Sequence, residues 1–197
     1  MAKLHFRYGT MGSSKTAQLL MTRFNYIEKG RKVWLIKPSV DTRDGEAVIK
    51  SRIGLEAKAD VISPEDDILI IYRNKWCAGT APDVIIADEC QFFTEAHIFQ
   101  LRKIVSDFDI PVLCYGLRTD FRCEFFPGSA ALFKCADEIE EVKSICSCGE
   151  KSIVNARINK LGQAVTEGDQ IELGGNDRYV GMCWKCYANA ISKKQNC

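Results

Sequence analysis

The stretch that decides the fold lies at residues 9–16 and reads Gly9-Thr10-Met11-Gly12-Ser13-Ser14-Lys15-Thr16. It follows a short apolar-rich run at residues 4–8, which is typical of a strand. A strand, a tight loop of small residues and a Lys-Thr pair at a helix start form the layout of a phosphate-binding loop. In such a loop, backbone N–H groups and the positive helix N-terminus face phosphate oxygens. We therefore expect Lys15 to reach the β- and γ-phosphates of a nucleotide and the Thr16 hydroxyl to ligate magnesium.

Ser14 stands where this motif usually has glycine. The serine keeps its backbone N–H, but a positive φ is costlier for it than for glycine. The alternative interpretation is a Gly/Ser turn with a solvated lysine. The helical pattern after the loop favours the phosphate-binding loop, and it predicts one buried helix face made of Ala17, Leu20, Phe24 and Ile27.

Composition sets the class of protein. The chain has 197 residues, of which 46% are hydrophobic and 27% charged, and its net charge is +1. These values suit one globular domain, or a main domain with a small appendage. The near-neutral charge gives no global basicity for a nucleic-acid groove, so we expect no nucleic-acid partner, with a local basic patch as the open alternative. No apolar run reaches membrane-spanning length and no apolar signal segment opens the chain, so we expect a cytoplasmic protein with no membrane partner.

The rest of the first 140 residues alternates between strand-like and helix-like patterns. Buried strands are predicted at residues 33–36, 84–87 and 111–116, the first of them ended by Lys37 and Pro38. Residues 39–60 are polar and long for a plain loop, so we expect them to be functional or mobile. The repeated strand–helix–strand order predicts a mostly parallel α/β sheet of the P-loop, RecA-like kind, flanked by helices.

Two helices are predicted between these strands. The first begins with Ser63 as N-cap and Pro64 at its first position, and ends near Trp76, before a loop at residues 78–82. The second covers residues 94–106, with Ala96, Phe99 and Ile104 on its apolar face.

Asp88 and Glu89 directly follow the apolar run at residues 84–87. A buried strand delivers such acids to the edge of the sheet where ligands bind. We expect Asp88 to hold magnesium opposite the phosphate loop. If the strand alternation continues, Glu89 leaves on the other face and has another task. An acidic turn at a strand end is the alternative interpretation.

From residue 138 onward, the strand–helix alternation gives way to a strand-like run, two cysteine pairs and a Gly-rich segment. This change predicts a second, smaller unit, so we divide the chain into residues 1–140 and 141–197. Residues 139–145 are strand-like. Of the ten cysteines, four form two close pairs, which are Cys146/Cys148 and Cys183/Cys186. Four thiolates suit a structural zinc site, which stabilises segments too small to fold on an apolar core. Reduced buried thiols are the alternative.

Taken together, these motifs resemble the type II thymidine kinases, small zinc-containing nucleoside kinases, from residue 4 to about residue 187. The resemblance rests on the phosphate loop, Asp41-Thr42-Arg43, the acidic motif at residues 88–93, the segment at residues 115–122, the Gly-Gly-Asn-Asp-Arg-Tyr stretch at residues 174–179 and the cysteine pairs. Two departures from the family are Ser14 in place of glycine and a Cys-x-Cys first pair in place of Cys-x-x-Cys.

The resemblance implies transfer of the γ-phosphate of ATP to the 5′-hydroxyl of thymidine. It assigns the role of catalytic base to Glu89, and we expect Arg43 to stabilise transition-state charge. It implies a C-terminal lasso held by zinc that closes over thymine. The implied nucleotide contacts are Gly9, Thr10, Met11, Gly12, Ser13, Ser14, Lys15, Thr16, Asp88, Glu89, Cys90 and Gln91. The implied nucleoside contacts are Met11, Phe92, Leu117, Phe121, Phe126, Gln170, Ile171, Glu172, Leu173, Gly174 and Tyr179. The family further suggests a homotetramer and feedback inhibition by dTTP, neither of which follows from a particular residue.

Two other classes of protein share parts of this pattern. A P-loop ATPase acting as a motor or a DNA-repair switch would have the loop and the acids, and would normally add a basic, aromatic-interleaved surface that this sequence lacks. A zinc-ribbon nucleic-acid-binding module would use Lys185, Lys193 and Lys194 beside the cysteines to hold phosphate. Consumption of ATP with thymidine, as opposed to consumption with DNA, separates these classes from the kinase.

Overall fold

A computed structural model describes residues 1–42, 45, 47–159, 163–170 and 179–195. Its centre is a six-stranded sheet in the order β5-β2-β6-β7-β1-β8, in which all neighbouring strands run parallel. The mostly parallel sheet predicted from the sequence is therefore confirmed. The strands are β1 (Leu4–Tyr8), β2 (Val33–Pro38), β5 (Asp60–Ile62), β6 (Val84–Ala87), β7 (Val112–Gly116) and β8 (Glu138–Glu141).

Strand β7 lies between β1, which precedes the phosphate loop, and β6, which precedes the acids. Its residue Val112 pairs with Leu4 on one side and with Ile85 on the other. This insertion of one strand between the two functional strands is the RecA-like arrangement. Because the strands are parallel, the phosphate loop and the acids leave the sheet at the same edge.

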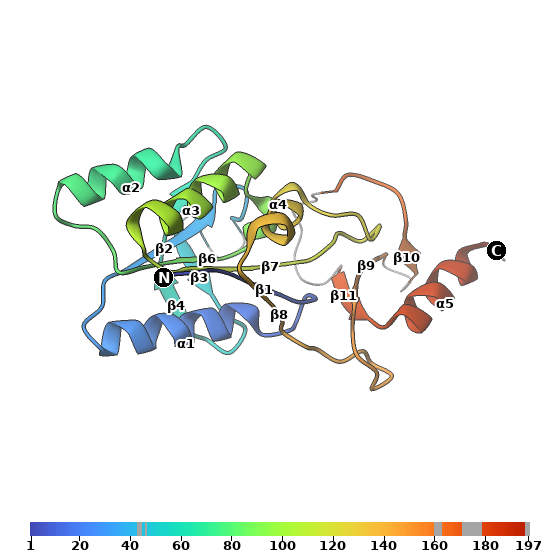
Figure 1. The fold of residues 1–197 in the computed structure, drawn as a ribbon. Coiled ribbons are helices and arrows are strands. Elements are labelled where there is room, and N and C mark those ends of the chain that lie inside the picture. The colour runs from blue at the N-terminus through green and yellow to red at the C-terminus, as the bar shows by residue number, and fades with distance from the viewer. Residues whose placement is uncertain (43–44, 46, 160–162, 171–178, 196–197) are drawn as a thin grey trace.

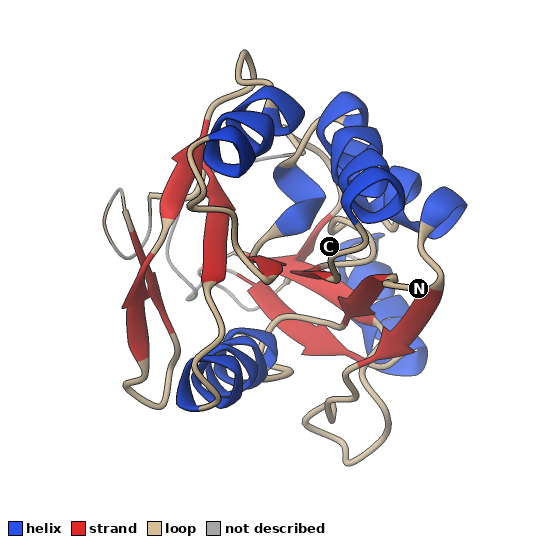
Figure 2. Cartoon of the chain, turned by 60° about the vertical axis from the view of Figure 1, so that its left-hand side comes forward, coloured by secondary structure: helices blue, strands red, loops and turns tan. Residues whose placement is uncertain are grey.

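Helices cover both faces of the sheet, as Figure 2 shows in blue on either side of the red strands. In Figure 1, α1 lies alone on one face, and α2, α3 and α4 lie on the other. One apolar core lies on each face, since Leu19 and Leu20 of α1 join one buried cluster and Ile98 and Leu101 of α3 join the other. The helices are α1 (Lys15–Glu28), α2 (Ile68–Cys77), α3 (Glu95–Phe108), α4 (Pro127–Cys135) and α5 (Trp184–Gln195).

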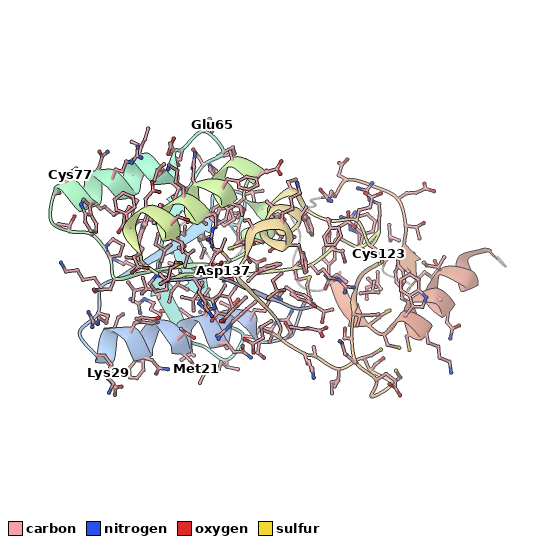
Figure 3. All side chains as sticks on the ribbon, viewed as in Figure 1. Met21, Lys29, Glu65, Cys77, Cys123 and Asp137 are labelled. Atoms are coloured by element: carbon pink, nitrogen blue, oxygen red, sulfur yellow. The ribbon has the colours of Figure 1, made fainter. Side chains whose placement is uncertain are left out.

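The predicted buried face of the first helix is wrong in part. Phe24 and Ile27 are 61% and 44% exposed, and Figure 3 shows the neighbouring Met21 on the side of α1 away from the sheet. The side that packs on the sheet carries Leu19 and Thr22, whose hydroxyl lies 3.3 Å from the Tyr115 hydroxyl. Ala17 and Leu20 are buried as predicted, so the periodicity holds for the first half of α1 and fails for its second half.

The same error affects the helix predicted at residues 94–106, which the structure confirms as α3 with Thr94 as its N-cap. Ala96 and Phe99 were predicted on the apolar face but are exposed, Phe99 by 45%, whereas Ile104 is buried as predicted. The buried face instead includes Ile98, Leu101 and His97, whose ring packs edge-on against Phe93.

The start predicted for the second helix is also wrong. Asp67, not Ser63, is the N-cap of α2, and its side chain accepts a hydrogen bond from the Ile70 N–H at 2.9 Å. The Ser63 N–H instead donates to the Asp66 side chain at 2.6 Å, which closes a turn before the helix. The Gln100 side chain of α3 accepts the Ile68 N–H at 2.9 Å, so a tertiary contact fixes the helix start.

Residues 39–60 contain more regular structure than the sequence predicts. Strands β3 (Val48–Lys50) and β4 (Glu56–Lys58) form an antiparallel hairpin beside the phosphate loop. Strand β2 runs through Lys37 to Pro38, whereas these residues were predicted to end it, because Pro38 pairs with Ile62 of β5 at the edge of the sheet.

Beyond the sheet, the chain forms a small C-terminal lobe, drawn at the right of Figure 1. It holds β9 (Val154–Ile158), β10 (Ala164–Val165) and β11 (Tyr179–Met182) in a three-stranded antiparallel sheet, with α5 packed against it. The strand predicted at residues 139–145 is shorter and ends at Glu141. The division of the chain at residue 140 stays a prediction.

In the described part of the chain, none of the helices combines the length and the apolar composition that crossing a membrane requires.

Candidate active site

A cavity of about 450 Å³ opens at the carboxyl edge of the sheet, which faces the C-terminal lobe in Figure 1. Its lining comes from the phosphate loop, the β3–β4 hairpin, the residues after β6 and β7, and the C-terminal lobe. This volume falls in the range of small-molecule sites. One cavity therefore joins segments that lie far apart in the sequence.

The phosphate loop is held close to the sheet. The Gly9 N–H donates to the Gly116 carbonyl at 3.2 Å, so the loop continues the pairing of β1 with β7. A methyl group at Gly9 would lie 2.4 Å from the Val142 carbonyl oxygen, which excludes any other residue there. Gly12 has φ of 80° and Ser14 has φ of 63°, both in the left-handed region. Ser14 thus adopts the conformation that glycine usually supplies at this place, and its backbone is strained.

Lys15 is buried at the start of α1, and its ammonium group turns back over the loop. It donates to the Thr10 carbonyl at 2.9 Å and to the Gly9 carbonyl at 3.2 Å. The Lys15 ammonium therefore lies over the phosphate loop, whose sequence predicts that it binds phosphate. Thr16 follows on the first turn of the helix and also lines the cavity.

Asp88 and Glu89 line the cavity across from the phosphate loop. Glu89 has φ of 47° and precedes the short 3₁₀ helix η1 (Cys90–Phe92), so the strand ends before it. The expectation that strand alternation separates the two carboxylates is therefore wrong. A left-handed turn at Glu89 turns the chain instead, and the Glu89 N–H donates to Asp88 Oδ1 at 3.0 Å. A strained non-glycine backbone beside a cavity points to function.

Gln91 is fully buried and fixes the Glu89 carboxylate. Its Nε2 donates to Glu89 Oε2, and its Oε1 accepts the Leu117 N–H at 3.0 Å. Gly116 lies against this side chain, because a methyl group there would come within 2.8 Å of Gln91 Oε1. The acid is thereby linked to the segment that follows β7.

The other half of the cavity has an apolar and aromatic wall. Leu117, Phe121 and Phe126 line it together with Phe92, whose ring packs edge-on against Phe126 at a centroid distance of 5.5 Å. Flat apolar walls of this kind suit an uncharged planar ring.

Arg157 supports this wall from the C-terminal lobe. The carbon of its guanidinium lies 3.8 Å from the centroid of the Phe121 ring, and its Nε donates to the Tyr179 hydroxyl at 2.9 Å. Arg157 is 5% exposed, and its guanidinium also donates to the Asp169 carbonyl at 2.8 Å. One buried cation therefore holds two aromatic walls of the cavity in place.

Asp120 organises the segment between Phe121 and the C-terminal lobe. Its Oδ1 accepts the N–H groups of Arg122 and Glu124 at 2.8 and 2.9 Å. Its Oδ2 accepts from the Gln170 side chain at 3.1 Å. Gln170, predicted to contact substrate, therefore reaches the cavity rim tied to this carboxylate.

The four cysteines of the two pairs come together at the base of the C-terminal lobe. Their sulfur atoms all lie within 4.8 Å of one another, and the Cys148 and Cys183 sulfurs are 3.6 Å apart. The predicted gathering of these thiols is confirmed. Hydrogen bonds from the backbone N–H groups of Cys148 and Cys183 lower the pKa of Cys146 to about 6. Bonds shared with the Cys148 and Cys183 thiols raise the pKa of Cys186 to about 12. Four thiols gathered this closely fit a soft divalent metal such as zinc.

With this geometry in place, comparison with known proteins identifies the family. A model of the thymidine kinase family matches residues 2–187. The chain belongs to the thymidine kinase family. It is 46% identical to the thymidine kinase of Jannaschia sp. (strain CCS1), with 97% of each chain covered. It is 44% identical to that of Ruegeria pomeroyi, with 96% of each covered, and 42% identical to that of Photobacterium profundum, with 98% of this chain and 100% of that one covered.

The family resemblance implies a set of nucleotide and nucleoside contacts, and most of those that the structure describes line the cavity. The exceptions are Gly9 and Thr10, which lie at the base of the phosphate loop, and Cys90. The Cys90 thiol is fully buried and donates to the Ala87 carbonyl at 3.2 Å. Burial, and then a bond to Cys114, raises its pKa well above the usual value. Arg43, Ile171, Glu172, Leu173 and Gly174 lie outside the described residues.

Some residues of this thymidine kinase family site were missed in the sequence. Arg52, at the tip of the β3–β4 hairpin, lines the cavity beside Gly12, where a methyl group would lie 3.6 Å from its Nη1. Asn155 and Asp120 also line it. One signal in the sequence pointed to Arg52, which is a basic residue within a long polar segment. No local pattern marks Asn155 as a residue of the site.

Proposed function

We propose that this chain transfers the γ-phosphate of ATP to the 5′-hydroxyl of thymidine, giving thymidine monophosphate. The observation that carries the proposal is that one cavity joins the phosphate loop to an aromatic wall and has Glu89 in its lining. Membership of the thymidine kinase family and relatives aligned over nearly their full length support the same activity.

The phosphate loop and α1 receive ATP in this proposal. Backbone N–H groups of the loop and the N-terminus of α1 face the phosphates, and the Lys15 ammonium reaches their oxygens. Thr16 and Asp88 offer the hydroxyl and carboxylate oxygens that Mg²⁺ prefers. Mg²⁺ bound there with ATP neutralises charge on the β- and γ-phosphate oxygens.

Glu89 is the general base in this proposal. Its carboxylate accepts the proton of the 5′-hydroxyl as that oxygen attacks the γ-phosphorus and the bond to the β-phosphate oxygen breaks. The hydrogen bond from Gln91 supports the role, because it fixes the orientation of the Glu89 carboxylate at the cavity. The aromatic wall formed by Phe92, Phe121 and Phe126 receives the thymine ring.

Two arginines complete the proposed phosphoryl-transfer site. Arg43 keeps the role predicted from the sequence, stabilising the charge that develops on the transferred phosphoryl group. Arg52 adds a second guanidinium on the phosphate side of the cavity, beside Gly12. Both arginines suit phosphate because a guanidinium offers paired N–H donors.

The cysteine cluster holds zinc in a structural role in this proposal. Four sulfur ligands fill a tetrahedral zinc site and leave no position for substrate. Cys146, Cys148, Cys183 and Cys186 then tie the loop before β9 to the start of α5. A homotetramer and inhibition by dTTP remain predictions from the family resemblance, and location in the cytoplasm remains a prediction from the sequence.

A nucleoside panel tests the proposed activity. The purified chain with ATP and Mg²⁺ is expected to convert thymidine to its 5′-monophosphate faster than it converts purine nucleosides. ATP consumption is measured in parallel with DNA in place of the nucleoside. Hydrolysis stimulated by DNA, with no phosphorylation of thymidine, would overturn the proposal in favour of a P-loop ATPase.

A further inference from the structure

Asn155 of β9 connects three separate segments around the cavity. It is 3% exposed, and both ends of its side-chain amide are used. Its Oδ1 accepts the Met11 N–H at 2.8 Å, and its Nδ2 donates to the Thr119 carbonyl at 2.9 Å. One side chain of the C-terminal lobe thus holds both the phosphate loop and the segment after β7.

The orientation of this amide follows from its partners. A backbone N–H can only donate and a carbonyl can only accept, so the oxygen of Asn155 must face Met11 and its nitrogen must face Thr119. No other common side chain of this size offers an acceptor and a donor in this arrangement. The requirement for asparagine is therefore chemical as well as steric.

The two partners belong to different segments around the cavity. Met11 lies in the phosphate loop, between Thr10 and Gly12. Thr119 lies two residues before Phe121, which lines the aromatic wall. The bonds of Asn155 therefore join the loop proposed to receive ATP to the wall proposed to receive the nucleoside.

Close packing reinforces the contact between the C-terminal lobe and the phosphate loop. A methyl group at Gly181 of β11, the strand paired with β9, would lie 3.2 Å from the Met11 carbonyl oxygen and 2.6 Å from Ser152 Oγ. The lobe thus has little room to move relative to Met11 without breaking the Asn155 bonds.

We propose that Asn155 is a positioning residue that couples the two substrate sites, so that binding of one substrate orders the site of the other. The inference rests on the proposed function and goes beyond it. When ATP fixes the phosphate loop, the Met11 N–H holds the Asn155 amide, and the amide holds the Thr119 segment. A nucleoside that binds second then meets a wall that is already ordered, which gives positive coupling between the two ligands.

Equilibrium binding measures this coupling directly. The affinity of the full, metal-loaded chain for a non-hydrolysable ATP analogue with Mg²⁺ is determined with and without saturating thymidine. We expect thymidine to tighten binding of the analogue at least about fivefold in the wild-type chain, the lower end of typical coupling. Asn155→Leu keeps the branched shape of the side chain but removes both hydrogen bonds. The ratio of the analogue's Kd without thymidine to its Kd with thymidine should then lie within about twofold of one.

Asn155→Asp is the second variant. Aspartate keeps the acceptor for the Met11 N–H but turns a carboxylate oxygen toward the Thr119 carbonyl, so the connection is broken at one end. The ratio compares one variant with itself, so any effect of the added charge on nucleotide affinity cancels. We expect the same loss of coupling. If Asn155→Leu does not fold, this variant tests whether Asn155 couples the two substrate sites.

Asn159→Leu is the matched control. Asn159 follows β9 in the same lobe and exchanges hydrogen bonds with Gln163 within its own hairpin, away from the cavity. It should keep the wild-type ratio. A wild-type ratio within twofold of one, or a folded Asn155 variant with an unchanged ratio, would overturn the coupling role. Phosphorylation of thymidine by the wild-type chain is assayed alongside, and its absence would refute the proposed function itself.

Discussion

Gln91 donates a hydrogen bond from its side-chain amide to the carboxylate of Glu89. The other end of the same amide accepts the Leu117 N–H at 3.0 Å. The proposed base is therefore oriented by a neighbour that is itself fixed to the nucleoside side of the cavity. This relationship gives Gln91 a positioning role that can be separated from substrate binding.

Replacing Gln91 should impair turnover more than binding. In Gln91→Leu the Glu89 carboxylate loses its donor and can rotate, so we expect kcat to fall about tenfold, below the full value of a general base. The KM for ATP should change less than twofold on the same scale, because the phosphate loop is untouched. Steady-state kinetics with both substrates checks this, and an unchanged kcat would remove Gln91 from the mechanism.

The strained backbone at Ser14 predicts a stabilising substitution. Ser14 has φ of 63°, a conformation that costs a non-glycine residue about 1 kcal/mol or more. Ser14→Gly should therefore raise the free energy of unfolding by about 0.5–1 kcal/mol. Ser106→Gly, in the last turn of the right-handed helix α3, should instead lower it by up to about the same amount. Denaturant unfolding of both variants tests this, and a loss of stability in Ser14→Gly would refute the strain.

The cysteine cluster predicts metal content. Elemental analysis of freshly purified protein should find about one zinc per chain, as expected for four thiolates in one tetrahedral site. Cys148→Ser should lower the zinc content and the melting temperature, because a metal site couples to folding. Cys77→Ser, which changes an exposed thiol outside the cluster, should leave both unchanged. Protein without metal would contradict the zinc site.

The position of Arg157 predicts an effect on the nucleoside alone. Arg157→Gln removes the cation from the Phe121 ring and frees the Tyr179 hydroxyl, so the KM for thymidine should rise about tenfold or more, in line with a lost buried charge-assisted bond. The KM for ATP should stay within about twofold. Arg157→Lys should recover little, because an ammonium lacks the planar fork. Equal changes in both KM values would point to general unfolding of the lobe.

Much of the fold follows from local sequence. The run before Gly9, the Lys-Thr pair and the apolar strand before Asp88 each carry their own signal, and the parallel sheet follows from their order. The gathered cysteines were predictable because their pairing has no other common purpose in such a chain.

The remainder depends on tertiary contacts. The left-handed turn at Glu89 has no local signal, so strand alternation misplaced that side chain. The α2 start is set by Gln100 from another helix. Asn155 and Arg157 act through partners more than twenty residues away, on Met11, Thr119 and Tyr179. The pattern of apolar and polar residues along the chain does not predict hydrogen bonds between side chains so far apart in the sequence.

The central claim is that Glu89 is the base for phosphoryl transfer, and single-turnover kinetics of Glu89→Gln test it most directly. Glutamine keeps the size and the hydrogen-bonding capacity of the side chain but cannot take the 5′-hydroxyl proton. We predict that the rate of thymidine phosphorylation falls at least about a hundredfold, while thymidine and the ATP analogue still bind. A variant that phosphorylates thymidine at a near-normal rate would contradict the account.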